Sequence, residues 1–169
     1  MNRFLSLTPA LLLLFAGTAA ALDSDQNQPI ELSAGQADMS NVTGVGVYTE
    51  DVVLVQGTMR ITGDKMTVYT SPAGELVKAV VEGKPATYRQ LPEGEQEYVH
   101  AEAPRMEYTA EPPRLITLMD GAVLTQGKNR FQGETIRYRV DEDQVLAQGG
   151  KDRVNITFYP NQKSGADSE

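Results

Sequence analysis

The sequence contains no cysteine and no tryptophan, and its only histidine is His100. Without thiolates the protein can form neither disulfides nor zinc–thiolate sites, and it has no cysteine nucleophile. A Ser–His–Asp arrangement would have to use His100, which alternation points outward between Val99 and Ala101. The sequence also lacks the Gly-x-Ser-x-Gly elbow of many hydrolases. We therefore expect His100 to be an exposed strand residue and the protein not to be an enzyme.

Positive charge is scarce as well. The chain has 15 Lys and Arg against 23 Asp and Glu, a formal net charge of −8, which makes nucleic acid a poor partner. The acidic run Asp141–Asp143 lacks the glycine and the distal glutamate of a calcium loop. Gly44–Gly46 is not followed by a helical pattern, as a phosphate-binding loop would be. The sequence therefore predicts no metal, nucleotide or other cofactor.

A long apolar run occurs only at the start of the chain. Asn2 and Arg3 precede the apolar stretch Phe4–Phe15, and small residues follow at 19–21. This order is typical of a signal peptide, which we expect to be cleaved after Ala21. The run is shorter than the roughly 20 residues that cross a bilayer. The predicted organisation is a signal segment at 1–21, one domain at 22–159 and a flexible polar tail at 160–169.

Alternation with period two dominates the rest of the sequence. It is clear in Thr58–Thr62, Asp64–Tyr69, Glu134–Tyr138 and Arg153–Phe158. Such segments recur every 8 to 12 residues or so, with Gly, Pro, Asp and Asn between them. This spacing predicts an all-β sandwich, jelly roll or barrel.

An internal repeat underlies this pattern. Residues 53–64 align with residues 123–134 at a constant offset of 70, and each copy contains Gln-Gly and a second glycine before an acidic residue. We expect two similar β halves, with one turn after each Gln and another before each acidic residue.

Alternation also assigns side chains to faces, since the apolar side of a two-faced strand points to the interior. Both faces are apolar in 52–55 and 122–124, which stay unassigned. Methionine and tyrosine are prominent in the inward set, and both suit a surface that accepts flexible chains. The inward set comprises Ile30, Leu32, Met39, Val45, Val47, Met59, Ile61, Met66, Val68, Ala86, Tyr88, Val99, Met106, Tyr108, Ile116, Leu118, Phe131, Ile136, Tyr138, Val154, Ile156 and Phe158.

These residues lie in a sequence that resembles the OstA-like, or LptA, family of periplasmic lipopolysaccharide-transport proteins. The similarity covers nearly all of the chain after the signal segment. One departure is Glu50-Asp51, where the family usually has Gly-Asn. The segments that carry the resemblance are Gln28–Ile30, Ala37–Asp38, Asp51–Thr58, Ile61–Lys65, Gly83–Tyr88 and Gly121–Leu124.

The resemblance implies an open, twisted β-jelly roll of about sixteen short antiparallel strands. It implies a protein that stacks head to tail in the periplasm and relays lipopolysaccharide from the inner to the outer membrane. The implied partners are an inner-membrane LptC-like domain and an outer-membrane LptD-like domain of the same fold. The acyl chains of lipid A are expected inside the roll.

By position, the family's lipid contacts fall on or near Ile30, Leu32, Tyr88 and Tyr108, all members of the inward set. We predict lipid contact for the whole inward set except Val45, Ala86, Val99, Val154, Ile156 and Phe158. Edge strands with unpaired backbone groups are expected to join the copies. The residues predicted at these edges are Ile30, Leu32, Val154, Ile156 and Phe158.

The negative charge of both ligand and protein means that binding must rely mainly on apolar contact, although Lys or Arg at the rim can still meet phosphates. At roughly 0.8 kcal/mol per buried CH₂, several fully buried acyl chains would bind too tightly to be released. Either the chains are only partly buried in an open groove, or they pass between equivalent grooves, which keeps the net free energy of each step near zero. An alternative from a different class is a structural adaptor, which links envelope proteins through its β edges and never holds lipid.

Overall fold

A computed structural model describes residues 25–160 of the chain. The expected signal segment, its cleavage point after Ala21 and the tail beyond Pro160 lie outside the described residues. Within the described range, no helix is long and apolar enough to cross a membrane.

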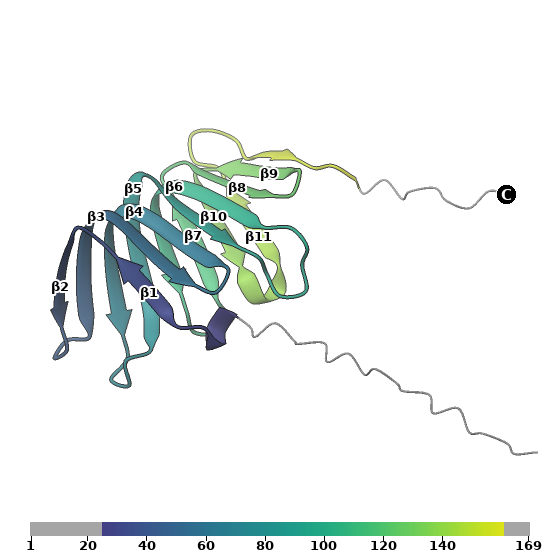
Figure 1. The fold of residues 1–169 in the computed structure, drawn as a ribbon. Coiled ribbons are helices and arrows are strands. Elements are labelled where there is room, and N and C mark those ends of the chain that lie inside the picture. The colour runs from purple at the N-terminus through teal and green to yellow at the C-terminus, as the bar shows by residue number, and fades with distance from the viewer. Residues whose placement is uncertain (1–24, 161–169) are drawn as a thin grey trace, which may run out of the picture.

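The described chain is almost entirely β, as predicted, with two short 3₁₀ helices and twelve antiparallel strands (Figure 1). Period-two alternation of apolar side chains is the reason, because only an extended backbone places them all on one side. The elements are η1 (Asp25–Asn27), β1 (Ile30–Ser33), β2 (Gln36–Ser40), β3 (Val45–Gln56), β4 (Met59–Thr70), β5 (Leu76–Gln90), β6 (Val99–Thr109), β7 (Leu115–Met119), β8 (Ala122–Gln126), β9 (Asn129–Gly133), β10 (Thr135–Arg139), η2 (Val140–Glu142), β11 (Gln144–Gln148) and β12 (Asn155–Thr157).

The strands form one sheet that is bent into two facing layers. The first layer runs β2-β3-β4-β5-β6-β7-β10-β11, and the second runs β1-β3-β4-β5-β6-β8-β9-β12. We call them layer A and layer B. The long strands β3 to β6 cross from one layer to the other, so each layer contains eight strand segments. Counted in this way, the twelve strands make the sixteen segments of the predicted open jelly roll.

Irregularities at mid-length bend the long strands along a common line, the fold line. The pairing register shifts there in β3, β4 and β5. At Gly63 in β4, an added Cβ would lie 2.6 Å from Val81 Cγ1 and 2.8 Å from the Glu82 carbonyl oxygen, so only glycine allows this close approach. The shift also changes which alternate residues face inward, and Ile61 and Met66 are therefore both buried.

The bend in β3 is made by two non-glycine residues. Glu50 and Asp51 both have left-handed backbone angles, with φ of 69° and 51°. These two positions are where the sequence departs from the Gly-Asn of the resembling family. Glycine and asparagine adopt this left-handed conformation more readily than Glu50 and Asp51 do, so the Gly-Asn expected from the resemblance would suit the bend.

The internal repeat corresponds to two equivalent hairpins, β3–β4 and β8–β9, which both lie in layer B. Each has a two-residue turn that opens with a glycine of positive φ, 58° at Gly57 and 55° at Gly127. The predicted first turn is thus confirmed. The turn predicted before the acidic residue is absent from the first copy, because Gly63 lies within β4 at its bend. In the second copy, Gly133 ends β9.

The two ends of the sheet are open edges. Strands β1 and β2 pair only with β3, while β11 pairs only with β10 and β12 only with β9. The last strand is shorter than predicted, so Val154 and Phe158 flank β12 rather than belong to it. The reason is that the Tyr159 N–H donates to the Asn129 side chain at 3.0 Å, which ends the backbone ladder with β9.

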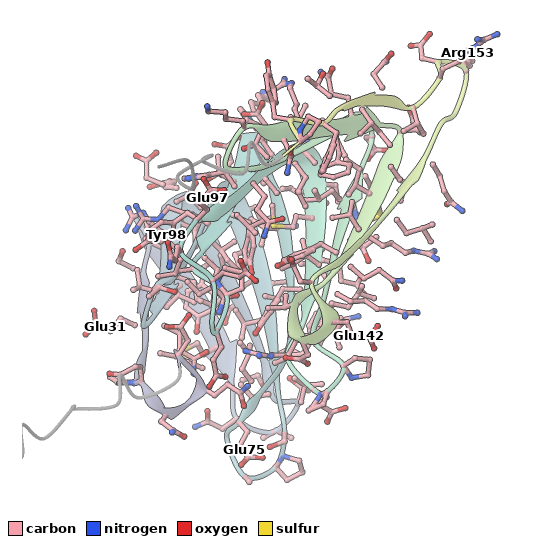
Figure 2. The ribbon with its side chains drawn as sticks, turned by 90° about the vertical axis from the view of Figure 1, so that its right-hand side faces the viewer. Glu31, Glu75, Glu97, Tyr98, Glu142 and Arg153 are labelled. Atoms are coloured by element: carbon pink, nitrogen blue, oxygen red, sulfur yellow. The ribbon has the colours of Figure 1, made fainter. Side chains whose placement is uncertain are left out.

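Charged side chains occupy the outside of the roll. Glu31, Glu142 and Arg153 project away from the ribbon into solvent (Figure 2). This distribution leaves the space between the layers to apolar residues.

Candidate functional site

The interior between the layers is one continuous apolar cluster. Layer A contributes Met66 and Met106, and layer B contributes Met59 and Leu124, each at most 1% exposed. Side chains buried to this degree are in van der Waals contact with their neighbours on all sides. A guest chain can therefore enter only if the layers move apart or the flexible methionines rearrange.

Most residues predicted to line the interior do face it. Leu32 and Phe131 are half-buried and pack against the core. Ile30 and Met39 lie on inward-facing rows but are 43% and 65% exposed, because the N-terminal edge leaves them uncovered. The fully buried members are Met59, Ile61, Met66, Val68, Tyr88, Met106, Tyr108, Ile116, Leu118, Ile136 and Tyr138.

The inward assignment of Val45 and Val47 is wrong. In this part of β3, Gly46 and Tyr48 are buried, and the two valines occupy the outer face. The small glycine makes room for the aromatic ring, since a Cβ at Gly46 would lie 2.8 Å from Tyr48 Cε2. Val47 is paired with Thr67 across β4, on the outside of layer A.

The two segments that alternation left unassigned now have definite faces. Their buried residues are Val52, Leu54, Ala122 and Leu124, and their half-buried outward residues are Val53, Val55 and Val123. His100 is exposed on β6, as predicted. Among residues 25–160, no group of three or more His, Asp and Glu side chains is arranged to hold a metal ion.

Four tyrosines bring hydroxyl groups into the cluster, and burial raises the pKa of three of them, Tyr88, Tyr108 and Tyr138. Burial raises the pKa of Tyr88 well above its ordinary value, and the nearby Tyr138 and Tyr108 add to the effect. Burial likewise raises the pKa of Tyr138, whose hydroxyl donates to Asp143 Oδ1 at 3.0 Å. The Tyr88 hydroxyl donates to Gln90 Oε1. The raised pKa values keep these phenols neutral, so the interior contains polar groups but no charge from its tyrosines.

The side opposite the fold line is where the turns of the two layers approach each other, and we call it the mouth. Here the carboxylate of Asp25 in η1 accepts three hydrogen bonds from layer B. The donors are the Thr58 backbone N–H at 2.7 Å, the Thr58 hydroxyl at 2.6 Å and Gln90 Nε2 at 2.7 Å. We call this set the Asp25 latch, because it holds the N-terminal segment against layer B at the mouth.

An ion pair marks the layer A side of the mouth. Arg114, in the turn before β7, donates from its backbone N–H and from Nε to Asp141 of η2, at 2.8 and 2.6 Å. Partial burial opposes ionisation of Asp141, but these hydrogen bonds outweigh it and lower the pKa of the carboxyl. Arg114 and Val140 face Asp25, Thr58 and Gln90 across a cavity of about 210 Å³ that joins the layers.

The residues of the mouth were not predicted from sequence. Gln90 carried the only usable signal, because alternation along Ala86, Tyr88 and Gln90 places a polar side chain in an inward position of β5. Asp25 and Arg114 meet it through contacts between distant segments, which a single sequence does not indicate.

Comparison with known families decides what kind of protein this is. The family described as "LptA/(LptD N-terminal domain) LPS transport protein" matches residues 31–144, most of the chain and most of both layers. The chain belongs to this family. The resemblance on which the sequence interpretation relied is therefore confirmed.

Individual members of the family match over most of their length. The lipopolysaccharide export system protein LptH of Pseudomonas aeruginosa is 31% identical over 96% of this chain and 99% of its own. LptA of Escherichia coli K12 is 33% identical over 85% of this chain and 78% of its own. LptA of Haemophilus influenzae is also 33% identical, over 95% and 93%.

The fold agrees with a solved member of the family. The crystal structure of P. aeruginosa LptH, described as the periplasmic LptA-homologous component of the lipopolysaccharide transport device, matches with a TM-score of 0.74 and 30% identity. The match covers 81% of this chain and 99% of that one. The two-layered open roll is thus shared with this solved member of the family.

Proposed function

We propose that this chain is a periplasmic lipopolysaccharide carrier that holds acyl chains between layers A and B and relays them from the inner to the outer membrane. The observation that carries the proposal is the continuous apolar interior in a member of this family. The named relatives are lipopolysaccharide export proteins, which supports a transport role rather than an enzymatic one. Export after cleavage at Ala21 and a mature domain at 22–159 are part of the same proposal.

The mouth offers an acyl chain a lateral way into the interior, in addition to the open ends of the sheet. The fold line is covalently continuous across the four long strands, whereas at the mouth a cavity separates Arg114 and Val140 from the residues of layer B. Each CH₂ moved from water to the interior contributes roughly 0.8 kcal/mol, which offsets the free energy needed to separate the layers. Passing the chain to an equivalent interior in the next protein then costs little net free energy.

The relay needs neighbouring copies, and the open edges supply the surfaces. Ile30 on β1 and Ile156 on β12 are 43% and 58% exposed, at opposite ends of the sheet. Pairing one edge with the other gives a head-to-tail array that can continue into LptC-like and LptD-like partner domains.

A proline at Ile156 should reduce this assembly while leaving the monomer folded, since β12 is a three-residue strand outside the core. Light scattering over a concentration series measures the oligomers, and Ile156→Val, which retains the N–H, is the matched control. Identical oligomer distributions for the two variants would remove β12 from the interface.

Photo-crosslinking in cells tests lipid binding itself. Phe131 faces the interior but is only half-buried, so a bulky photoreactive side chain fits there, and Gln132 next to it faces outward. We expect lipopolysaccharide adducts at position 131 and none at position 132. Adducts with protein alone at position 131, in a folded and functional variant, would support the structural adaptor instead.

A further inference from the structure

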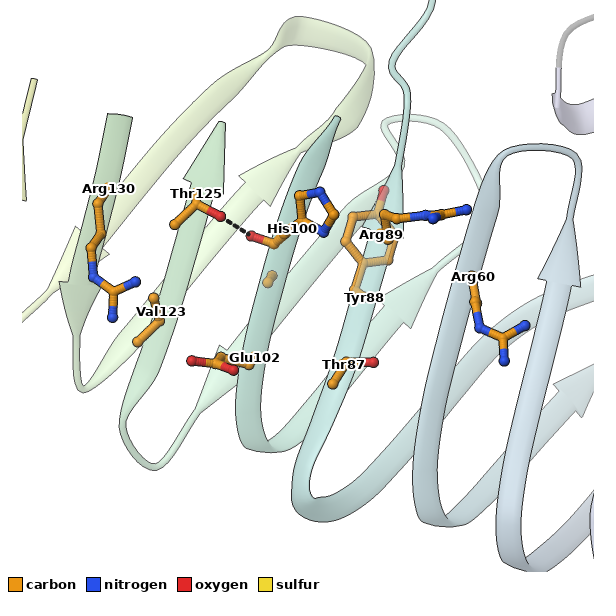
Figure 3. A pocket seen from close by; sticks show the side chains of 10 residues that line it. Arg60, Thr87, Tyr88, Arg89, His100, Glu102, Val123, Thr125 and Arg130 are labelled. Atoms are coloured by element: carbon orange, nitrogen blue, oxygen red, sulfur yellow. Dashed lines mark hydrogen bonds between the residues drawn. The ribbon is translucent and has the colours of Figure 1, made fainter. Parts of the chain in front are cut away.

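The outer face of layer B carries a row of cationic side chains that the lipid-carrying interior does not use. In the pairing register, Arg60 is opposite Arg89, Arg89 is opposite His100, His100 is opposite Thr125, and Thr125 is opposite Arg130. Figure 3 shows these side chains on adjacent strands, with the Thr125 hydroxyl donating to the His100 carbonyl oxygen at 3.5 Å. We call the three arginines and His100 the cationic row.

The arginines of the row have no ion-pair partner among residues 25–160. None of the ion pairs between described residues includes Arg60, Arg89 or Arg130. The Arg89 guanidinium instead lies over the ring of Tyr98, 4.8 Å from its centroid. Like charges directly opposite each other destabilise a sheet. In a chain with a formal net charge of −8, three arginines in line that form no ion pair with any described residue point to an external anion.

The surface is hollowed where the row crosses it. A pocket of about 410 Å³ has a floor of small residues that includes Thr87, Val123 and Thr125, and its walls include the cationic row and Glu102 (Figure 3). The arginines lie at both ends of the hollow. Arg89 and Arg130 are three strand spacings apart, or about 14 Å between their backbones.

We propose that this hollow binds a sugar carrying two phosphate groups. Arginine binds phosphate through two parallel N–H···O bonds, and the spacing of Arg89 and Arg130 provides one such donor at each end. Glu102, between them, accepts hydrogen bonds from sugar hydroxyls and disfavours a third anionic group. The bound diphosphorylated sugar is either a free sugar phosphate or the headgroup of a glycolipid. The site lies outside the interior, so the inference does not depend on acyl-chain binding.

Calorimetry at low salt tests the site with fructose 1,6-bisphosphate, fructose 6-phosphate and inorganic phosphate as probes. We expect the bisphosphate to bind at least about tenfold more tightly than the other two, because only it reaches both arginines. Arg89→Gln and Arg130→Gln should each weaken binding by about tenfold, the usual effect of losing a charged hydrogen-bond partner. The control is Arg137→Gln, an exposed arginine on the outside of layer A, which should change binding less than about twofold.

A second measurement distinguishes the two sources. If the ligand is a lipid headgroup, the protein should bind phosphatidylcholine vesicles that contain diphosphoryl lipid A, and Arg89→Gln should weaken this binding. If the ligand is a free sugar phosphate, the protein should bind the soluble bisphosphate in an Arg89-dependent manner but not the vesicles. Arg89→Gln removes a like-charge apposition as well as the contact with Tyr98, and these effects oppose each other, so its thermal midpoint should stay close to that of the wild type. Equal effects of Arg89→Gln and Arg137→Gln, or no preference for two phosphates over one, would overturn the proposal.

Discussion

Removing the Asp25 latch should detach η1 from layer B at the mouth without unfolding the roll. In Asp25→Ala, the Thr58 N–H, the Thr58 hydroxyl and the Gln90 amide lose their shared acceptor. Each charge-assisted hydrogen bond contributes at most roughly 1.5–3 kcal/mol, and water replaces part of it at this half-buried position. We expect a total of about 3 kcal/mol, which corresponds to an increase of about a hundredfold in the detached fraction of η1.

Hydrogen exchange of the Thr58 amide reports this detachment directly, because that N–H donates to Asp25 Oδ1. Its protection should fall about a hundredfold in Asp25→Ala, while amides in the middle of β7 retain theirs. Asp38→Ala, which removes an exposed carboxylate from β2, is the control for the change in charge. A loss of protection below about threefold, or an equal loss in both variants, would refute the latch.

Two further predictions concern stability. Glu50→Gly should stabilise the protein by about 0.5–1 kcal/mol in urea unfolding, because glycine tolerates the φ of 69°. The control is Glu75→Gly at an exposed position, which should not stabilise the protein. Stabilisation by both substitutions would disprove the strain argument. The Arg114–Asp141 pair should contribute about 1 kcal/mol that is present above about pH 4 and lost as the pH falls through the lowered pKa of Asp141. Asp141→Asn should accordingly flatten urea-unfolding stability between about pH 5 and pH 3, and an unchanged slope would contradict this assignment.

The local patterns of the sequence determined the all-β class, the repeated hairpin and most inward faces. Met59, Ile61, Met66 and Val68 could be assigned correctly even though the bend in β4 shifts the alternation between them. Period-two burial is a property of the extended backbone, so it can be read from neighbouring residues alone. Family membership was also readable, because its motifs are short and contiguous.

The tertiary structure decided everything that depends on how distant strands align. It placed Val47 outside, because only packing reveals that Gly46 makes room for the ring of Tyr48. It brought Asp25 to Gln90 at the mouth and aligned Arg89 with Arg130 on one outer row. Pairing register and layer closure are set by contacts between residues far apart in the chain, and no local pattern in the sequence encodes those contacts.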